Sequence, residues 1–446
     1  MNGEIRKKTK EIKNFLINKD ASNLNKFIKS SHPADLAEIF NFLKKEERKE
    51  LLSFLSFEEA ANVLPKIEPV FLKELLDDIE NVRLSQILEI MPPDEAADIL
   101  GDLQKNRKKQ ILNLIKKEEA DDVNLLLKYK EDTAGGIMTS DFFSLYSGMT
   151  VTEAIEKLRI VDISNISYIY VVTDNNNFVG VLPLRNLITA DSFVKIGEIA
   201  NKNTVRVTVD VDQEEVANLV KKYDLRAIPV VDNTNKLVGI VTVDDILDIV
   251  TEEASEDIYR MAGIKEDESL LHRSIPVAVR FRLPWLIACL MGGMVAAGIV
   301  GVFEETLTAV IILAAFVPVI MGMGGNIGTQ SATIIVRGLA TGSINIKDAW
   351  HLLWRELRIG LLIGIICGFA IGIIAQIWQG SPELGIVVGT SMTATVTIAA
   401  FLGAFFPIFF QRLGIDPAIV SGPVITTAKD ITALLIYFGI ATLIML

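Results

Sequence analysis

The chain has 446 residues, of which 50% are hydrophobic and 22% are charged, and its formal net charge is −12. The acidic excess lies entirely in residues 1–273, which carry a formal charge of −13, whereas residues 274–446 carry +1 and hold long apolar runs. This composition argues against a nucleic-acid-binding protein, which needs basic surface. The two cysteines and three histidines indicate neither a disulfide framework nor a zinc site.

Residues 1–130 are predicted to form an all-α helical-repeat domain. Apolar side chains recur there every three or four residues, as in amphipathic helices. The segment Pro33–Phe40 aligns without a gap on Pro93–Leu100, about sixty residues later. Short helical units that repeat in this way stack into arrays that no single unit would stabilise alone. Most such arrays are scaffolds, and the charged N-terminus ahead of this one does not predict a cleavable signal peptide.

Residues 131–250 are predicted to hold two copies of an α/β unit in which two strands and a turn precede a helix. Strands are expected at 168–172 and 178–181 in the first copy, and at 227–232 and from 237 in the second copy. The unit resembles a tandem pair of cystathionine-β-synthase (CBS) domains. This resemblance implies a regulatory ligand-binding pair rather than a catalyst.

The second CBS copy matches the family pattern for nucleotide binding better than the first copy does. In nucleotide-binding members of that family, a Thr and an Asp three residues later hold the ribose. Thr242 and Asp245 stand at those places in the second copy, whereas the first copy has Pro183 and Asn186 there. The resemblance therefore suggests ATP as a ligand of the second copy.

Residues 251–273 are predicted to form a connecting helix that leads to the membrane. Glu252 and Glu256, like Glu253 and Asp257, are like charges one helical turn apart. Each such pair costs a few tenths of a kcal/mol on an isolated helix. A bound divalent cation would relieve this repulsion, and its loss would restore it. The alternative is an ordinary solvated acidic helix.

Residues 274–446 are predicted to form an all-α transmembrane domain with five spans. Basic side chains lie at the span ends expected inside, whereas the two outside loops carry Glu304, Glu305 and Glu383 and no Lys or Arg. This asymmetry places the acidic half of the chain in the cytoplasm and the C-terminus outside. The predicted spans are 283–303, 307–335, 357–378, 385–410 and 417–446.

Two of these spans carry unusual residues for a membrane helix. The second span contains a glycine-rich stretch in which Asn326 and Gln330, four residues apart, share one helix face. These two side chains would hydrogen-bond across helices or line a hydrated pore. The fourth span has small residues over 389–397, which predicts close helix packing and no ligand.

The fifth span contains one carboxylate, Asp430, about 20 Å from its start and well inside a hydrocarbon core about 30 Å thick. An ionised Asp there costs at least about 2.5–3.5 kcal/mol, so an intramembrane acid indicates function. The alternative is a structural partner for Lys429, but adjacent helix side chains point about 100° apart. We therefore predict that Asp430 lies on a cation pathway. A Lys429 side chain turned towards that pathway would repel the ion.

These parts occur in one order, with Gly325-Asn-Ile-Gly-Thr-Gln330 in the second span and Thr426-Thr-Ala-Lys-Asp430 in the fifth. In this arrangement the chain resembles the MgtE family of magnesium channels. The resemblance implies a homodimer with a pore at its interface, a connecting "plug" helix and cytosolic domains that sense Mg²⁺. It makes Asp430 the selectivity residue. The predicted pore residues are Asn326, Gln330, Thr426, Thr427 and Asp430.

The resemblance also implies that the cytosolic domains bind Mg²⁺ through carboxylates. Asp94 with Asp98, and Asp245 with Asp248, each share one helix face, and Asp416 would pair with the plug helix. Because Mg²⁺ keeps several waters, one or two carboxylates per site suffice. The predicted metal ligands are Glu59, Asp94, Asp98, Glu214, Asp224, Asp245, Asp248, Glu252, Glu253, Glu256, Asp257, Asp416 and Asp430.

The resulting hypothesis is a magnesium-selective channel of the plasma membrane that mediates Mg²⁺ influx and is closed by cytosolic Mg²⁺. One alternative is a secondary transporter that couples a substrate to protons or sodium at Asp430, with a nucleotide-sensing CBS pair. Another is a membrane receptor that transports nothing, although a mere anchor needs no intramembrane acid. No catalytic constellation or phosphate-binding loop is found, so an enzyme is not predicted.

Overall fold

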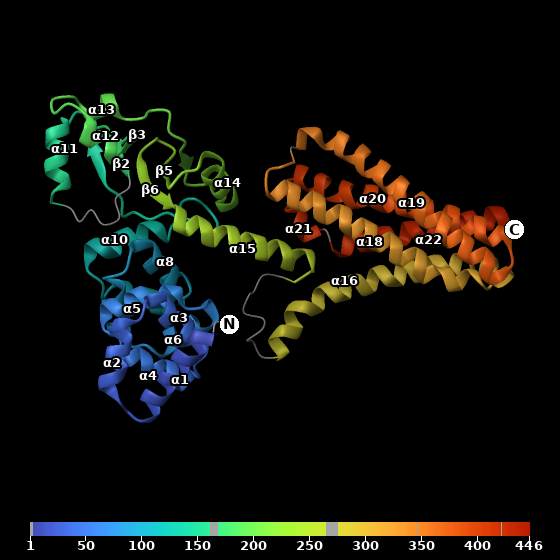
Figure 1. Cartoon of the computed structure of the whole chain (residues 1–446), viewed down its shortest axis with the longest axis horizontal. Coiled ribbons are helices and arrows are strands. Elements are labelled where there is room, and N and C mark those ends of the chain that lie inside the picture. Colours follow the sequence, from blue (N-terminus) through green and yellow to red (C-terminus); the bar gives the residue numbers. More distant parts are fainter. Residues whose placement is uncertain (1–2, 161–167, 265–274, 345, 421) are drawn as a thin grey trace. The chain divides into compact units, whose positions relative to one another are not determined.

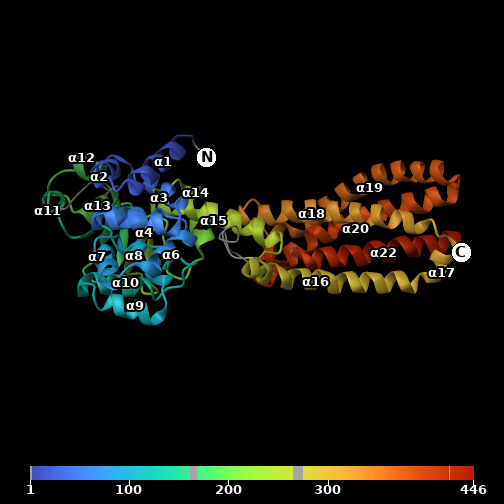
Figure 2. The same ribbon diagram turned by 90° about the horizontal axis from the view of Figure 1, so that it is seen from below.

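The computed structural model describes residues 3–160, 168–264, 275–344, 346–420 and 422–446. The chain divides into two compact units, Met1–Val250 and Thr251–Leu446. Figures 1 and 2 show short helices and small sheets in the first unit and long helices in the second.

The first unit begins with an array of short helices, as the repeat predicted. α3 and α8 both start with a proline, Pro33 and Pro93, whose fixed φ suits the first turn of a helix. In both helices the apolar positions spaced by three and four are buried. The elements are α1 (Gly3–Ile17), α2 (Ala21–Ser30), α3 (Pro33–Asn41), α4 (Lys45–Phe54), α5 (Phe57–Val63), η1 (Leu64–Lys66), α6 (Pro69–Asp78), α7 (Asn81–Leu88), α8 (Pro93–Gly101), α9 (Lys105–Leu112) and α10 (Lys117–Leu126).

The CBS pair follows as two small sheets of the same topology. In each described sheet the first strand is parallel to the second, and the second is antiparallel to the third. The strands are β1 (Ser144–Tyr146), β2 (Tyr168–Val172), β3 (Phe178–Pro183), β4 (Val207–Thr208), β5 (Ala227–Val231) and β6 (Leu237–Thr242). The helices around them are α11 (Val151–Leu158), α12 (Leu184–Thr189), α13 (Ile196–Ile199) and α14 (Gln213–Tyr223). The strands predicted for both copies are confirmed.

The two CBS copies exchange equivalent contacts through their turns. Asn176 and Asn235 both adopt positive φ, which asparagine tolerates better than most residues. The Asn176 side chain donates to the Leu237 carbonyl at 3.1 Å, and the Asn235 side chain donates to the Phe178 carbonyl at 3.2 Å. This reciprocal pairing shows a pseudo-twofold relation between the copies.

A single helix, α15 (Val243–Met261), continues from the second CBS sheet. Neither Gly nor Pro interrupts its sequence, so the helix runs unbroken from Asp245 to Arg260. The predicted plug helix is therefore the second half of a longer helix rather than a separate element. Gly263, with a φ of +76°, follows its end. Residues 265–273 of the predicted connection lie outside the described residues.

The second unit is a bundle of long helices. Among the described residues, four helices are long and apolar enough to cross a membrane. α18 has 28 residues, as many as α16, but its middle is rich in Gly, Asn and Gln, and its crossing stays a prediction. The elements are α16 (Ile275–Val302), α17 (Glu304–Ala309), α18 (Leu313–Ala340), η3 (Ile346–Asp348), α19 (Ala349–Gln379), α20 (Pro382–Arg412), α21 (Pro417–Val420) and α22 (Pro423–Met445). The four helices that qualify are α16, α19, α20 and Val424–Met445 of α22.

Two of the predicted span boundaries are wrong. The second span was placed from 307, but α17 covers Glu304–Ala309 and α18 begins only at Leu313. The fifth span was placed from 417, but α21 ends at Val420 and α22 begins at Pro423. Proline favours the first turn of a new helix, so α22 begins the last span at Pro423. Asp430 therefore lies about 10 Å from the start of this span rather than about 20 Å.

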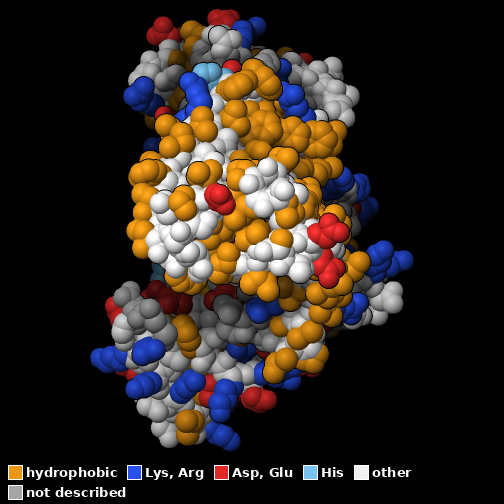
Figure 3. Space-filling model, turned by 90° about the vertical axis from the view of Figure 1, so that its right-hand side faces the viewer, with side chains coloured by type: hydrophobic (Ala, Val, Ile, Leu, Met, Phe, Trp, Pro, Cys, Tyr) orange, Lys and Arg blue, Asp and Glu red, His pale blue; other side chains and the backbone are white. Residues whose placement is uncertain are grey.

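The surface of the second unit is largely apolar. Figure 3 shows hydrophobic side chains over much of the face near the C-terminus, with few acidic ones among them. Phe369 is 72% exposed and Leu443 is 86% exposed, as expected for helices that face lipid. Inside the bundle, α19 and α20 approach closely, because a methyl group at Gly364 would lie 2.7 Å from the Thr393 carbonyl oxygen. The small-residue packing predicted for the fourth span is confirmed.

Candidate functional site

The first candidate site is a cluster of carboxylates on α8 and on the first turn of α15. Pro93 starts α8, which places Asp94 and Glu95 in its first turn, where the helix dipole favours negative charge. Asp98 follows one turn later. The charge of Asp94 raises the pKa of Asp245, and the charges of both raise the pKa of Asp98, so these carboxylates lie near one another. We call Asp94, Glu95, Asp98 and Asp245 the α8–α15 cluster.

Burial and repulsion from neighbouring carboxylates raise the pKa of every member of the α8–α15 cluster. Burial is the largest cause in each case, and the pKa rises to about 7 for Glu95, about 7 for Asp98 and about 6 for Asp245. Asp98 as a whole residue is solvent-exposed, but the surrounding protein displaces water from its carboxylate. Neighbouring carboxylates add repulsion.

Few groups compensate this charge. A hydrogen bond with Thr139 lowers the pKa of Asp94 against the effect of burial, and Lys66 does the same for Glu95. One buried oxygen of Asp94, Oδ1, has no hydrogen-bond partner. Within the described residues, no three His, Cys, Asp or Glu side chains converge to hold a metal ion directly.

Thr242 and Asp245 form one local unit. The Thr242 hydroxyl donates to Asp245 Oδ2 at 2.5 Å, where β6 passes into α15. The pair predicted to hold a ribose is thus brought together, and Asp245 also belongs to the α8–α15 cluster. Asp248 lies about one turn further along α15 and is exposed.

Three other predicted metal ligands, Glu59, Asp224 and Glu214, do not interact with this cluster among the described contacts. Glu59 accepts hydrogen bonds at 2.9 Å from both the backbone N–H and the hydroxyl of Ser56, which caps α5. Asp224 is exposed at the left-handed end of α14. Glu214 lies in the first turn of α14, where its backbone N–H donates to Asp212. None of the three contributes to the raised pKa values of the α8–α15 cluster.

A second acidic group lies in the second unit, where the end of α15 meets the start of α21. Burial raises the pKa of Asp257 to about 6, with further repulsion from Asp416 and Glu253. Arg260 pairs with both Glu256 and Asp416. Glu252, one turn earlier, is exposed.

The sequence prediction counted only acids in this second group and missed the arginine. The spacing of four residues between Glu256 and Arg260 was readable from the sequence, because such residues share a helix face. The resemblance implied that Asp416 pairs with this helix, and it does, but its partner Arg260 was not readable from the sequence, because 156 residues separate the two.

In the membrane bundle, the predicted pore residues fall into two groups. Asn326 and Gln330 on α18 and Thr426 on α22 are exposed, and Asp430 is half-buried. Thr427 instead packs against α16, where a methyl group added at Gly292 would overlap its side chain. Thr427 thus packs against another helix of the same chain.

The side chain of Lys429 points towards α18. Its side chain is buried, with 3% exposure. The ammonium donates to the Gly325 carbonyl at 3.1 Å and to Thr329 Oγ1 at 3.2 Å. The sequence alone did not show this direction.

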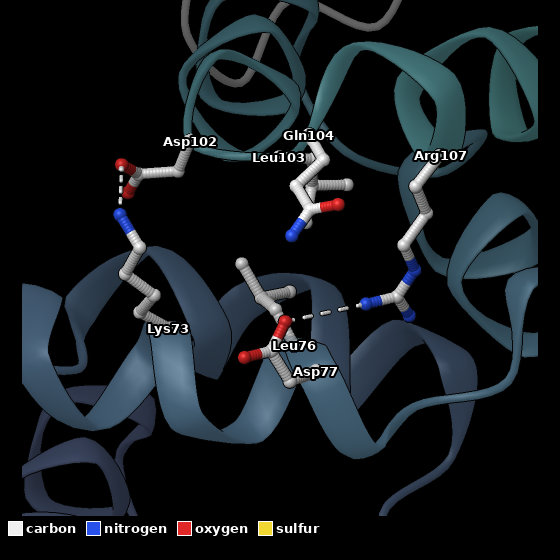
Figure 4. A pocket seen from close by; sticks show the side chains of 7 residues that line it. All are labelled: Lys73, Leu76, Asp77, Asp102, Leu103, Gln104 and Arg107. Carbon is white, nitrogen blue, oxygen red and sulfur yellow. Dashed lines mark ion pairs between the residues drawn. The ribbon is translucent and has the colours of Figure 1, made fainter.

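The helical array also contains an open pocket of about 510 Å³, shown in Figure 4. The charged side chains that line it form ion pairs with one another. Lys73 lies 3.6 Å from Asp102, and Arg107 lies 3.8 Å from Asp77. None of the predicted site residues lines it.

Known proteins resemble the chain over nearly its whole length. Residues 31–132 match the MgtE intracellular N domain, residues 134–192 and 196–252 match CBS domains, and residues 317–440 match the divalent cation transporter model MgtE. The magnesium transporter MgtE of Thermus thermophilus is 40% identical over 433 residues, which are 96% of each chain. That of Bacillus subtilis is 39% identical over 412 residues, 92% of this chain and 91% of the relative.

Solved structures match the cytosolic half. The cytosolic domain of the Mg²⁺ channel MgtE in complex with ATP aligns at 38% identity with a TM-score of 0.51, covering 54% of this chain and 99% of that one. The soluble part of a magnesium transporter aligns at 33% identity with a TM-score of 0.50, covering 56% and 99%.

The raised pKa values of the α8–α15 cluster predict a pH dependence of stability. The folded chain binds protons more tightly than the unfolded chain, so the penalty is full above about pH 7 and lost below about pH 4. Without divalent cations, the melting temperature of the chain in detergent should therefore rise as the pH falls from about 8 to about 5. Thermal unfolding followed by circular dichroism measures this rise.

Two matched variants show whether the pH dependence of the melting temperature comes from the α8–α15 cluster. The double variant Glu95→Gln/Asp98→Asn should flatten the pH dependence, whereas Asp224→Asn, at an exposed acid outside the cluster, should preserve it. An unchanged slope in the double variant would contradict the prediction.

Proposed function

The chain belongs to the MgtE family of transporters, and from that premise we propose that it carries Mg²⁺ into the cell through a pore between two copies. Cytosolic Mg²⁺ closes this pore. The relatives named above are magnesium transporters, and the match extends over nearly the full chain. The orientation we propose places residues 1–273 in the cytoplasm and the C-terminus outside, as the distribution of basic side chains favours.

The observation that carries this proposal is the half-buried carboxylate of Asp430 in a helix apolar enough to cross a membrane. A hydrated Mg²⁺ takes only one or two carboxylates and keeps several waters. Two copies of the chain would offer it two Asp430 side chains. The membrane potential drives a divalent cation inward with about 4.6 kcal/mol per 100 mV, twice the value for one charge.

Exposed polar side chains on the membrane bundle support a pore between two copies. Asn326, Gln330 and Thr426 are exposed on one copy. Polar groups are tolerated at membrane depth where they meet protein or water rather than lipid. A second copy would supply that cover and enclose a hydrated path. Thr427 has its own partner on α16, so we leave it out of the proposed lining.

The α8–α15 cluster is the proposed sensor of cytosolic Mg²⁺. An ion that keeps its waters would relieve the repulsion between the carboxylates of α8 and Asp245. When Mg²⁺ is scarce, the uncompensated charges would push α8 and α15 apart. Because α15 is one unbroken helix that also carries Arg260, displacement of its start would disturb the contact of its end with Asp416.

ATP is a second proposed ligand of the same region. The Thr242 hydroxyl and Asp245 are joined at 2.5 Å, in the positions that hold a ribose in nucleotide-binding CBS domains. A similar cytosolic domain has been solved in complex with ATP. Since Asp245 also belongs to the α8–α15 cluster, ATP binding there would alter the proposed Mg²⁺ sensor.

The pore proposal predicts that Asp430→Ala reduces Mg²⁺ flux into liposomes by at least about tenfold, because the carboxylate supplies the charge that attracts the ion. A fluorescent Mg²⁺ indicator inside the liposomes measures this flux. Glu383→Gln, at an exposed acid in the first turn of α20, should retain wild-type flux. Undiminished flux in Asp430→Ala would remove Asp430 from the ion path.

The sensor proposal predicts that Mg²⁺ protects the cytosolic half from proteolysis near residues 130–140 and 250–275. Ions bound at the α8–α15 cluster would hold the helical array and the CBS pair together and slow cleavage. Limited digestion of the full chain in detergent, with Mg²⁺ or with a chelator, measures the effect. If the cleavage rates are the same with Mg²⁺ and with chelator, the proposed sensing of Mg²⁺ by the cytosolic half is excluded.

A further inference from the structure

Lys429 is a buried cation whose hydrogen-bond partners are neutral. Its side chain is 3% exposed inside the membrane bundle. A buried charge is usually paired with an opposite charge. In the described part of the chain, however, Lys429 forms no ion pair, and its ammonium donates to a carbonyl and a hydroxyl. The carboxylate of Asp430, next to it in sequence, acts on the ammonium through its charge, but the two form no direct ion pair among the described contacts.

The partners of Lys429 form a slot on one face of α18. The Gly325 carbonyl and the Thr329 hydroxyl lie one turn apart, and Thr329 Oγ1 itself donates to that carbonyl at 2.9 Å. Between them along the helix is Gly328, where an added methyl group would overlap Lys429 Cδ. The slot therefore exists because residue 328 has no side chain. We call Gly325, Gly328 and Thr329 the lysine slot.

The slot supplies the two oxygen atoms to which the Lys429 ammonium donates. A lysine stem has four rotatable bonds, so the ammonium of Lys429 can reach partners on more than one side. In a low-dielectric interior, a carboxylate attracts an ammonium far more strongly than a neutral oxygen does. The two side chains leave the helix about 100° apart, but the flexible lysine stem would let an ammonium expelled from the slot swing towards the Asp430 carboxylate. The ammonium would then occupy the place that a permeating cation needs.

We propose that the lysine slot of α18 holds the Lys429 ammonium away from Asp430 and so keeps that carboxylate available to the ion. Lys429 and Gly328 are positioning residues in this account, because they act through Asp430. The inference rests on the proposed role of Asp430 in the pore.

The variant Gly328→Ala tests the proposal by filling the slot. It should expel Lys429 and reduce Mg²⁺ flux into liposomes by about tenfold or more, since an ammonium would then neutralise Asp430. Lys429→Met keeps a stem of similar length but carries no charge, and alone it should leave flux within about threefold of wild type. The double variant Gly328→Ala/Lys429→Met should recover flux to the level of Lys429→Met.

The double variant separates charge from packing. Methionine still meets the methyl group at position 328, so a purely steric defect would persist in the double variant. Recovery therefore shows that the charge of Lys429 blocks the path. A double variant as inactive as Gly328→Ala would overturn the proposal, as would a Gly328→Ala variant with full flux.

Two controls complete the design. Gly322→Ala on the same helix adds a methyl group that meets nothing within 4 Å, so it should conduct like wild type. Thr329→Val removes one hydrogen-bond acceptor of Lys429 without filling the slot. It should reduce Mg²⁺ flux, as Gly328→Ala does, and the double variant Thr329→Val/Lys429→Met should recover the flux. This second pair carries the test if Gly328→Ala does not fold.

The outcomes also distinguish this inference from the proposed function. If flux in wild type is independent of Asp430, the pore proposal fails. If flux depends on Asp430 but no recovery occurs with Lys429→Met, only the lysine slot is excluded.

Discussion

The constraint on which the rest of this structure depends is the placement of carboxylates where water and counter-charges are scarce. The α8–α15 cluster shows this most clearly, because burial raises the pKa of Glu95 and Asp98 to about 7 and neighbouring acids add repulsion. Such an arrangement is unfavourable by itself. In the proposed function, a bound cation would remove the repulsion and stabilise the contact between α8 and α15, and loss of the cation would restore the repulsion.

The helix α15 carries a residue of the α8–α15 cluster near one end and Arg260 near the other. α15 begins at the α8–α15 cluster and ends at Arg260, which pairs with Asp416 ahead of the last membrane helix. The helix has no Gly or Pro within it and is continuous over its whole length. The acids of the proposed sensor and the ion pair thus lie at the two ends of one continuous helix.

The element order, the CBS strands and the shared helix face of Asn326 and Gln330 could be predicted from the sequence, because periodicity and spacing are local properties. Directions set by distant contacts could not. The seating of Lys429 on α18 depends on Gly325 and Thr329, which precede it by 104 and 100 residues. Thr427 was assigned to the pore by its place in a motif, but the absence of a side chain at Gly292 decides where it packs. Glu59 satisfied the acidic pattern while serving as a helix cap.

The central claim is that one ion both permeates the bundle and controls it from the cytoplasmic side. Recording of single-channel currents from membrane patches, while Mg²⁺ on the cytosolic face is raised and then chelated, tests this claim most directly. The account predicts unitary Mg²⁺ currents whose open probability falls as cytosolic Mg²⁺ rises and recovers on chelation. Currents that ignore cytosolic Mg²⁺, or Mg²⁺ uptake without any unitary currents, would contradict it.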